Sequence, residues 1–89
     1  MGKNYIILKI GDEKILFYKD AAKAKYPNYV RLIADKQLNR ATKYYCLETV
    51  DPDDLETLID ILNSNPGAAL QISSYIADIV APDLNIKII

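Results

Sequence analysis

Within the first twenty residues, two short and mostly apolar runs flank a polar loop, which is typical of a β-hairpin. Tyr5–Ile10 and Lys14–Tyr18 predict two strands, joined by a three-residue loop at 11–13 that contains a glycine. Because side chains alternate along a strand, one face of this hairpin carries five apolar residues: Ile6, Leu8, Ile10, Ile15 and Phe17. The opposite face is also largely apolar, so the hairpin needs cover on both sides, from its own helices or from another chain.

The segment that follows predicts helices separated by a proline. Residues 19–25 form a short helix candidate rich in alanine, which Asp20 can cap. Pro27 is expected to interrupt the helix, because the residue before a proline avoids the helical region. Residues 28–41 fit either of two structures. Good helix formers favour a helix, whereas a hairpin would pair residues 29–34 with residues 42–47.

Two further strands are expected beyond the hairpin. Residues 43–50 are rich in aromatic and β-branched side chains, which favour a central strand. Near the end of the chain Leu84, Ile86 and Ile88 alternate with polar residues, which indicates a terminal strand.

Between these two strands the pattern changes to a helical period. Asp51 as N-cap and Pro52 at the first helical position predict a helix start. The apolar residues that follow recur every three or four positions: Leu55, Leu58, Ile59 and Leu62. The turn at 63–67 ends this helix, and a last helix spans 68–80, with an aliphatic stripe formed by Ile72, Ile76, Ile79 and Val80. The two helices are expected to pack as an antiparallel pair.

Together these elements predict a single compact α+β domain over residues 1–89. Its small, mostly antiparallel sheet would contain the N-terminal hairpin, the central strand and the C-terminal strand, with helices packed mainly on one face. A chain of only 89 residues buries a smaller fraction of its surface on folding than a larger domain does, so its stability is small. Self-association would bury more surface and add stability.

Composition narrows the setting and the chemistry. The single cysteine excludes an internal disulfide framework, and no apolar run is long enough to span a bilayer. The start of the chain lacks the apolar region of a signal peptide. We therefore expect a cytoplasmic protein that does not engage a membrane.

Groups for catalysis or for metal binding are scarce. The chain has no histidine, and its three glycines form no phosphate-binding loop. Cys46 has no basic partner set by the sequence, so a small buried hydrophobe is the preferred interpretation. We expect no catalytic residue, no metal site, no cofactor and no small-molecule substrate. A cysteine or carboxylate enzyme is the third class of function to test.

The charge of the chain changes sign near its middle. Through Val50 the chain has ten Lys and Arg residues against five acidic ones, a net charge of +5. From Asp51 onward it has one lysine against seven acids, a net charge of −6. Much of the acidic charge after Val50 is explained by the helix start at Asp51, where negative side chains are favourable. The basic side has no such explanation, and tyrosines are interleaved with its lysines and arginines.

The scarcity of catalytic and metal-binding groups, together with this surface chemistry, favours a small non-enzymatic binding or regulatory protein, such as an inhibitor, an adaptor or an accessory factor of microbial or viral type. The partner is expected to be another protein or a second copy of the chain. The alternative is binding of single-stranded or structured nucleic acid through residues 18–45. A basic face that is merely solvated is the competing interpretation. The candidate partner-binding residues are Tyr26, Tyr29, Arg31, Lys36, Arg40, Lys43 and Tyr44.

Overall fold

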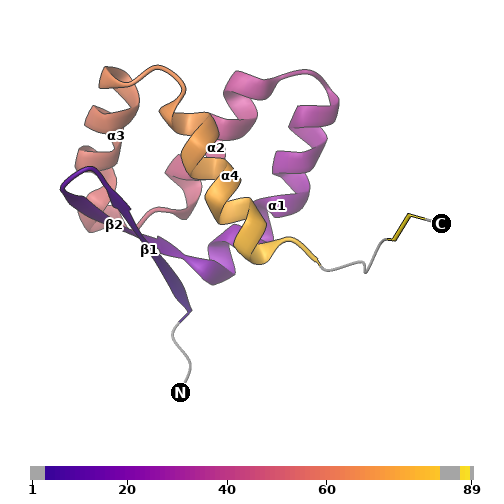
Figure 1. Ribbon diagram of the computed structural model, residues 1–89, viewed down its shortest axis with the longest axis horizontal. Coiled ribbons are helices and arrows are strands. Elements are labelled where there is room, and N and C mark those ends of the chain that lie inside the picture. The colour runs from indigo at the N-terminus through magenta and orange to yellow at the C-terminus, as the bar shows by residue number, and fades with distance from the viewer. Residues whose placement is uncertain (1–3, 83–86, 89) are drawn as a thin grey trace.

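The computed structural model describes residues 4–82 and 87–88 of the chain. Within these residues a hairpin is followed by helices, which confirms the α+β class (Figure 1). The elements are β1 (Tyr5–Ile10), β2 (Glu13–Tyr18), α1 (Lys19–Ala34), α2 (Leu38–Thr49), the 3-10 helix η1 (Pro52–Asp54), α3 (Leu55–Ser64) and α4 (Ala68–Val80). The terminal strand predicted at 84–88 falls on residues of which only 87 and 88 are described.

The hairpin is antiparallel, but its turn is shorter than predicted and β2 begins one residue earlier. Glu13 pairs with Ile10, so the turn contains two residues rather than three. Gly11, the first of these, has a φ of +61°, a conformation that favours glycine. In the described residues the sheet consists of these two strands alone.

The two faces of the hairpin differ in burial. Ile6, Ile15 and Phe17 belong to the hydrophobic core. On the other face Ile7 is 57% exposed and Tyr18 is 43% exposed. The inner face of the hairpin therefore anchors it to the helices, while its outer face is accessible to solvent.

Helix α1 runs without a break through Pro27, so the interruption predicted there is wrong. A proline inside a helix removes one hydrogen bond and crowds the preceding turn, at a cost of about 3 kcal/mol relative to alanine. The helix nevertheless continues because it buries Ala22, Tyr29 and Leu32 against the rest of the protein. Tertiary packing outweighs the local preference of the proline.

The segment 28–41, for which helix and hairpin were both open, forms the end of α1 and the start of α2. Between them lies a turn in which Lys36 adopts a left-handed φ of 62°. The amide of Gln37 donates to the Leu32 carbonyl at 2.9 Å, and that of Lys36 donates to the Ile33 carbonyl at 3.0 Å. These bonds satisfy carbonyl groups at the end of α1, as is common at helix C-termini.

The central strand predicted at 43–50 is wrong, because this segment is helical up to Thr49. Only Val50 keeps a strand-like contact, through an isolated bridge to Phe17. Ala41, Tyr45 and Thr49 are spaced by four residues and are all buried, which is the pattern of a helix face. Burial of this face overrides the β-propensity of the individual residues.

The helix start predicted at Asp51 is confirmed. The Asp51 side chain accepts a hydrogen bond from the Asp53 amide at 3.4 Å. α3 and α4 then run in opposite directions (Figure 1), but α4 packs more extensively on α2 and α1 than on α3. Ile59 and Ile79, expected in the two buried stripes, are 37% and 47% exposed. The two helices are thus neighbours rather than a closely packed pair.

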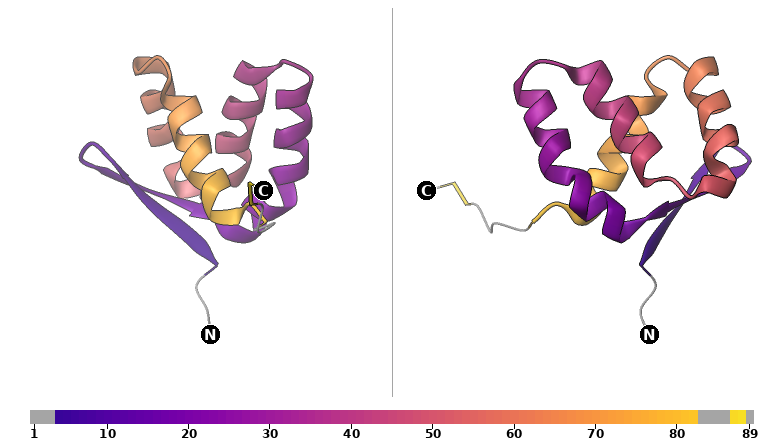
Figure 2. Two further views of the ribbon diagram at one scale, coloured as in Figure 1. Left: turned by 45° about the vertical axis from the view of Figure 1, so that its right-hand side comes forward. Right: turned by 180° about the vertical axis from the view of Figure 1, so that it is seen from behind.

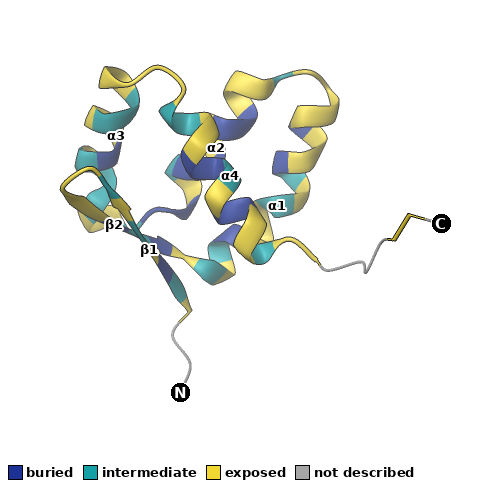
Figure 3. Ribbon diagram, viewed as in Figure 1, coloured by how far each residue is buried: buried dark blue, intermediate teal, exposed yellow. Residues whose placement is uncertain are grey.

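The core lies where α1, α2, α4 and the inner face of the hairpin meet (Figure 3), and α3 contributes the fully buried Leu58. Seen from behind, α1 and α2 lie side by side (Figure 2). The rings of Tyr29 and Tyr45 stack at a centroid distance of 4.4 Å, and the Tyr45 hydroxyl donates to the Ala22 carbonyl at 2.8 Å. No helix in the described ranges has the length and apolar character needed to cross a membrane.

Candidate functional site

The structure divides the predicted partner-binding residues into two groups. Five of them are exposed on or beside the α1–α2 turn: Arg31, Lys36, Arg40, Lys43 and Tyr44. Tyr29 is instead 8% exposed and belongs to the core, where its hydroxyl lies 3.4 Å from Ser73 Oγ. Tyr26 is half-buried beside it, with a ring-centroid distance of 6.2 Å to Tyr29. Tyr29 therefore cannot contribute contact area, because it already packs inside the protein.

The two arginines on this turn make contacts within the chain. Arg31 Nη1 lies 4.0 Å from Asp35 Oδ2. Arg40 donates to the Gln37 side chain at 2.8 Å and lies over the Tyr44 ring, with its Cζ atom 5.8 Å from the ring centroid. Such exposed contacts contribute little to stability, so these side chains could also reach a ligand.

Cys46 is fully buried on α2, as the preferred interpretation of the sequence requires. Its Sγ lies 3.6 Å from the Ala69 carbonyl. Burial raises the pKa of the thiol to about 12. A buried, protonated thiol is a poor nucleophile, so this cysteine packs as part of the core.

The acidic segment after the charge reversal binds the hairpin. The Leu16 amide donates to Asp54 Oδ2 at 2.9 Å, and the Asp51 amide donates to the Leu16 carbonyl at 2.8 Å. The Tyr18 hydroxyl donates to Asp51 Oδ1 at 3.1 Å, and this bond raises the pKa of Tyr18. The described residues contain no group of three or more His, Cys, Asp or Glu that could hold a metal ion. Two of the acidic side chains, those of Asp51 and Asp54, thus join the helical half to β2.

These same bonds show which edge of the hairpin is open. Both backbone groups of Leu16 point away from β1, and Leu16 lies opposite Ile7. In an antiparallel ladder, when the backbone N–H and C=O of one residue point away from the partner strand, those of the residue directly opposite also point outward. The N–H and C=O of Ile7, and those of Lys9 two residues later, therefore face away from β2. Within the described part of the chain no hydrogen bond joins them to another element.

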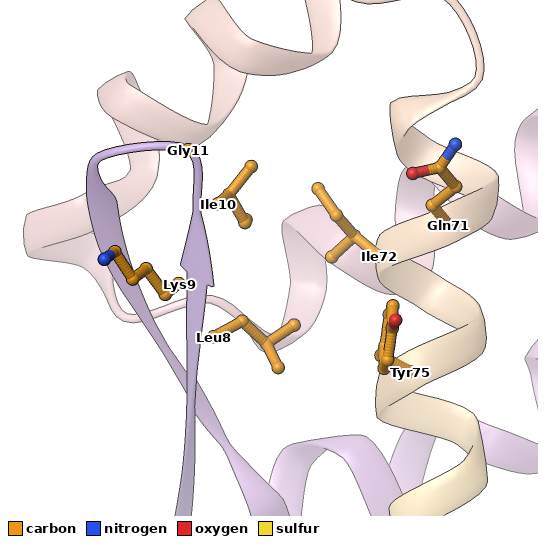
Figure 4. A pocket seen from close by; sticks show the side chains of 7 residues that line it. All are labelled: Leu8, Lys9, Ile10, Gly11, Gln71, Ile72 and Tyr75. Atoms are coloured by element: carbon orange, nitrogen blue, oxygen red, sulfur yellow. The ribbon is translucent and has the colours of Figure 1, made fainter.

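A groove of about 430 Å³ lies between this edge of β1 and helix α4 (Figure 4). It is lined by Leu8, Lys9, Ile10, Gly11, Gln71, Ile72 and Tyr75. Leu8 and Ile10 point toward Ile72 on α4, whereas Lys9 points to the other side of the strand (Figure 4). Residues from both faces of β1 thus line the groove, and none from β2 does so. The groove therefore follows the free edge of β1.

The groove continues past the tip of the hairpin. A second hollow of about 380 Å³ shares Ile10, Gly11, Gln71 and Ile72 with the first and reaches Ile61 of α3. One wall of the combined groove is thus a strand edge, and the other is formed by α4 together with residues of α3 and of the turn between the two helices. This arrangement can hold an extended segment, by backbone hydrogen bonds on one side and apolar contacts on the other.

The sequence alone did not point to Gln71 and Tyr75 as site residues. Tyr75 is 65% exposed, which is unusual for an aromatic ring beside a buried stripe. The signal that could have indicated it is its position between Ile72 and Ile76, outside the aliphatic stripe of the helix. No protein-family model, curated protein or solved structure matches this chain.

Proposed function

We propose that this chain is a small non-enzymatic binding protein that acts by contact with a macromolecule, and that the groove between β1 and α4 is its contact site. An inhibitor, an adaptor or an accessory factor would all work in this way. The groove has the size of a binding site and combines an apolar wall with polar groups at its rim, from Gln71 and Tyr75.

The observation that carries this proposal is the open edge of β1 beside that wall. The outward N–H groups of Ile7 and Lys9 can donate to the carbonyls of an extended chain, and their C=O groups can accept from its amides. Natural proteins usually shield such edges, and β1 pairs with β2 in continuous register without a bulge or a proline. An accessible strand edge next to exposed apolar side chains is typical of a surface that binds another chain.

Selection from a random seven-residue peptide library displayed on phage tests the proposal. We expect peptides that bind wild-type protein and that lose most of their binding to Tyr75→Ala, which removes an exposed ring from the groove wall. Tyr44→Ala is the matched control, because Tyr44 is 43% exposed on α2, outside the groove lining. If no peptide is enriched, or if Tyr44→Ala has the larger effect, the proposal fails.

A second candidate function is binding of nucleic acid through the α1–α2 turn. It is supported by the exposure of Arg31, Lys36, Arg40 and Lys43 together with the ring of Tyr44. Basic groups neutralise phosphates, and an exposed ring offers a face on which an unpaired base can stack. The overall charge of −1 weighs against this function.

Fluorescence anisotropy with labelled single-stranded RNA and duplex DNA, at low and at physiological salt, tests this second candidate. Affinity that falls steeply with salt, and that is lost when Arg31→Ala and Arg40→Ala are combined, would support it. Absence of binding even at low salt would eliminate it.

A further inference from the structure

We propose that the groove takes an extended peptide as a third strand of the sheet, with an acidic residue opposite Lys9 and an apolar residue on each side of it. This inference rests on the proposed function and specifies the chemistry of the ligand. It follows from the hydrogen-bonding pattern of β1, the alternation of its side chains and the charge on its outer face.

The hydrogen-bonding pattern defines how the ligand pairs with the strand. The outward groups of Ile7 and Lys9 are those to which an added strand bonds, because the alternate groups of β1 already bond to β2. A ligand residue paired with Lys9 places its side chain on the same face as Lys9. The residues before and after it face the groove, where Leu8, Ile10 and Ile72 lie.

The charge on the outer face defines the central residue of the ligand. Lys9 lies directly opposite Lys14, and like charges in such a pair repel each other. Across the described residues no ion pair joins either lysine to an acid. A carboxylate beside Lys9 would relieve this repulsion, whereas a cationic ligand would increase it.

The same charge argues against a second copy of the chain as the occupant. Pairing two copies through this edge would bring another Lys9 and another Lys14 to the same face. A separate peptide brings no such charge.

Anisotropy titrations with a labelled, end-capped peptide Thr-Val-Glu-Val-Thr test this proposal, with the matched peptide in which lysine replaces the glutamate. We expect wild-type protein to bind the glutamate peptide about fivefold more tightly, from the usual strength of cross-strand charge pairs. Lys9→Glu should reverse the preference, and because Lys9 is exposed this variant should keep its fold. Equal affinity for the two peptides in both proteins would overturn the proposal.

Amide hydrogen exchange of the complex tests strand addition itself. The Ile7 and Lys9 amides should exchange about tenfold more slowly with the peptide bound, because each then donates a hydrogen bond. Binding without this protection would overturn the proposal. A dimer of the free protein would also overturn it, if sedimentation equilibrium detects the dimer and Ile7→Pro dissociates it. A second copy of the chain would then occupy the edge of β1.

The outcome of the phage selection separates this proposal from the function on which it rests. If selected peptides bind in a way that depends on Tyr75 but show no apolar–acidic–apolar pattern, the inference about the ligand is wrong and the proposed function survives. If no peptide of any sequence binds, both fail.

Discussion

The backbone amide of Leu16 donates a hydrogen bond to the Asp54 carboxylate at 2.9 Å, across 38 positions of sequence. This bond holds the start of the α3 segment against β2. Asp54→Asn weakens the bond by removing its charge, and Asp54→Ala removes it. We expect Asp54→Ala to lower the free energy of unfolding by about 1–2 kcal/mol, in the usual range for bonds to charged groups.

Asp53→Ala is the matched control for this prediction. Asp53 is exposed in the same turn and shares the favourable position near a helix start. Among the described residues, however, its side chain accepts no hydrogen bond, and its backbone amide donates to Asp51. Urea denaturation of the two variants measures the difference. Equal destabilisation by both would mean that helix-start electrostatics, rather than the Leu16 bond, is what Asp54 provides.

The Tyr45 hydroxyl makes a buried hydrogen bond to the Ala22 carbonyl. Tyr45→Phe keeps the stack on Tyr29 but leaves that carbonyl without this partner. We expect a loss of about 1–2 kcal/mol in the free energy of unfolding. Tyr44→Phe, at an exposed ring on the same helix, should change it by less than about 0.5 kcal/mol. Thermal or urea unfolding measures both, and a neutral Tyr45→Phe would contradict the account of the core.

The buried thiol of Cys46 predicts a loss of stability at alkaline pH. Its pKa rises from an ordinary value of 9.0 to about 12 in the folded protein, so between these values the unfolded chain loses a proton that the folded chain keeps. The stabilisation from this group is fully present below pH 9 and is lost as pH rises toward 12. The slope from this group reaches at most about 1.4 kcal/mol per pH unit.

Cys46→Ala isolates this contribution, because all other titrating groups remain. Urea unfolding at pH 8 and at pH 10.5 should show that the stability gap between wild type and Cys46→Ala narrows at the higher pH. A gap that is constant over this range would show that the thiol is accessible or already ionised in the folded protein.

We expect replacement of Pro27 by alanine to stabilise the protein. The proline ring is exposed in the interior of α1, so Pro27→Ala removes little packing and restores a helical hydrogen bond. The gain of up to about 3 kcal/mol is offset in part by the greater freedom of the unfolded chain. We expect the free energy of unfolding to rise by about 1–2 kcal/mol in urea titrations. A decrease would mean that the proline ring packs or bends the helix in a way that the fold requires.

The elements that sequence reasoning predicted well have strong local signals. Two apolar runs around a glycine-containing loop identified the strands of the hairpin, and the cap at Asp51 with Pro52 identified the start of the following helical segment. The α1–α2 region lacked such signals. Pro27 suggested a break, and the aromatic and β-branched residues up to Thr49 suggested a strand. Burial of one face of each helix overrode both preferences, and burial depends on tertiary contacts that a local pattern does not contain.

The candidate site was predictable only in part, for the same reason. The hairpin's strands and Ile72 follow from periodicity, but the groove exists because α4 lies beside the free edge of β1. That placement results from the packing of α4 on α2 and α1. Among the predicted contact residues, Tyr29 was chosen because it is interleaved with lysines and arginines, a pattern that does not show whether its ring and hydroxyl are exposed. In the structure, Ser73 lies beside that hydroxyl instead.

The central claim is that this protein binds through the groove between β1 and α4. Chemical-shift mapping by ¹H–¹⁵N NMR with a peptide from the phage selection tests it most directly. The account predicts the largest shifts at Ile7, Lys9, Ile72 and Tyr75. Shifts concentrated at Arg31, Lys36, Arg40 and Tyr44 would contradict it and would place the contact site on the α1–α2 turn.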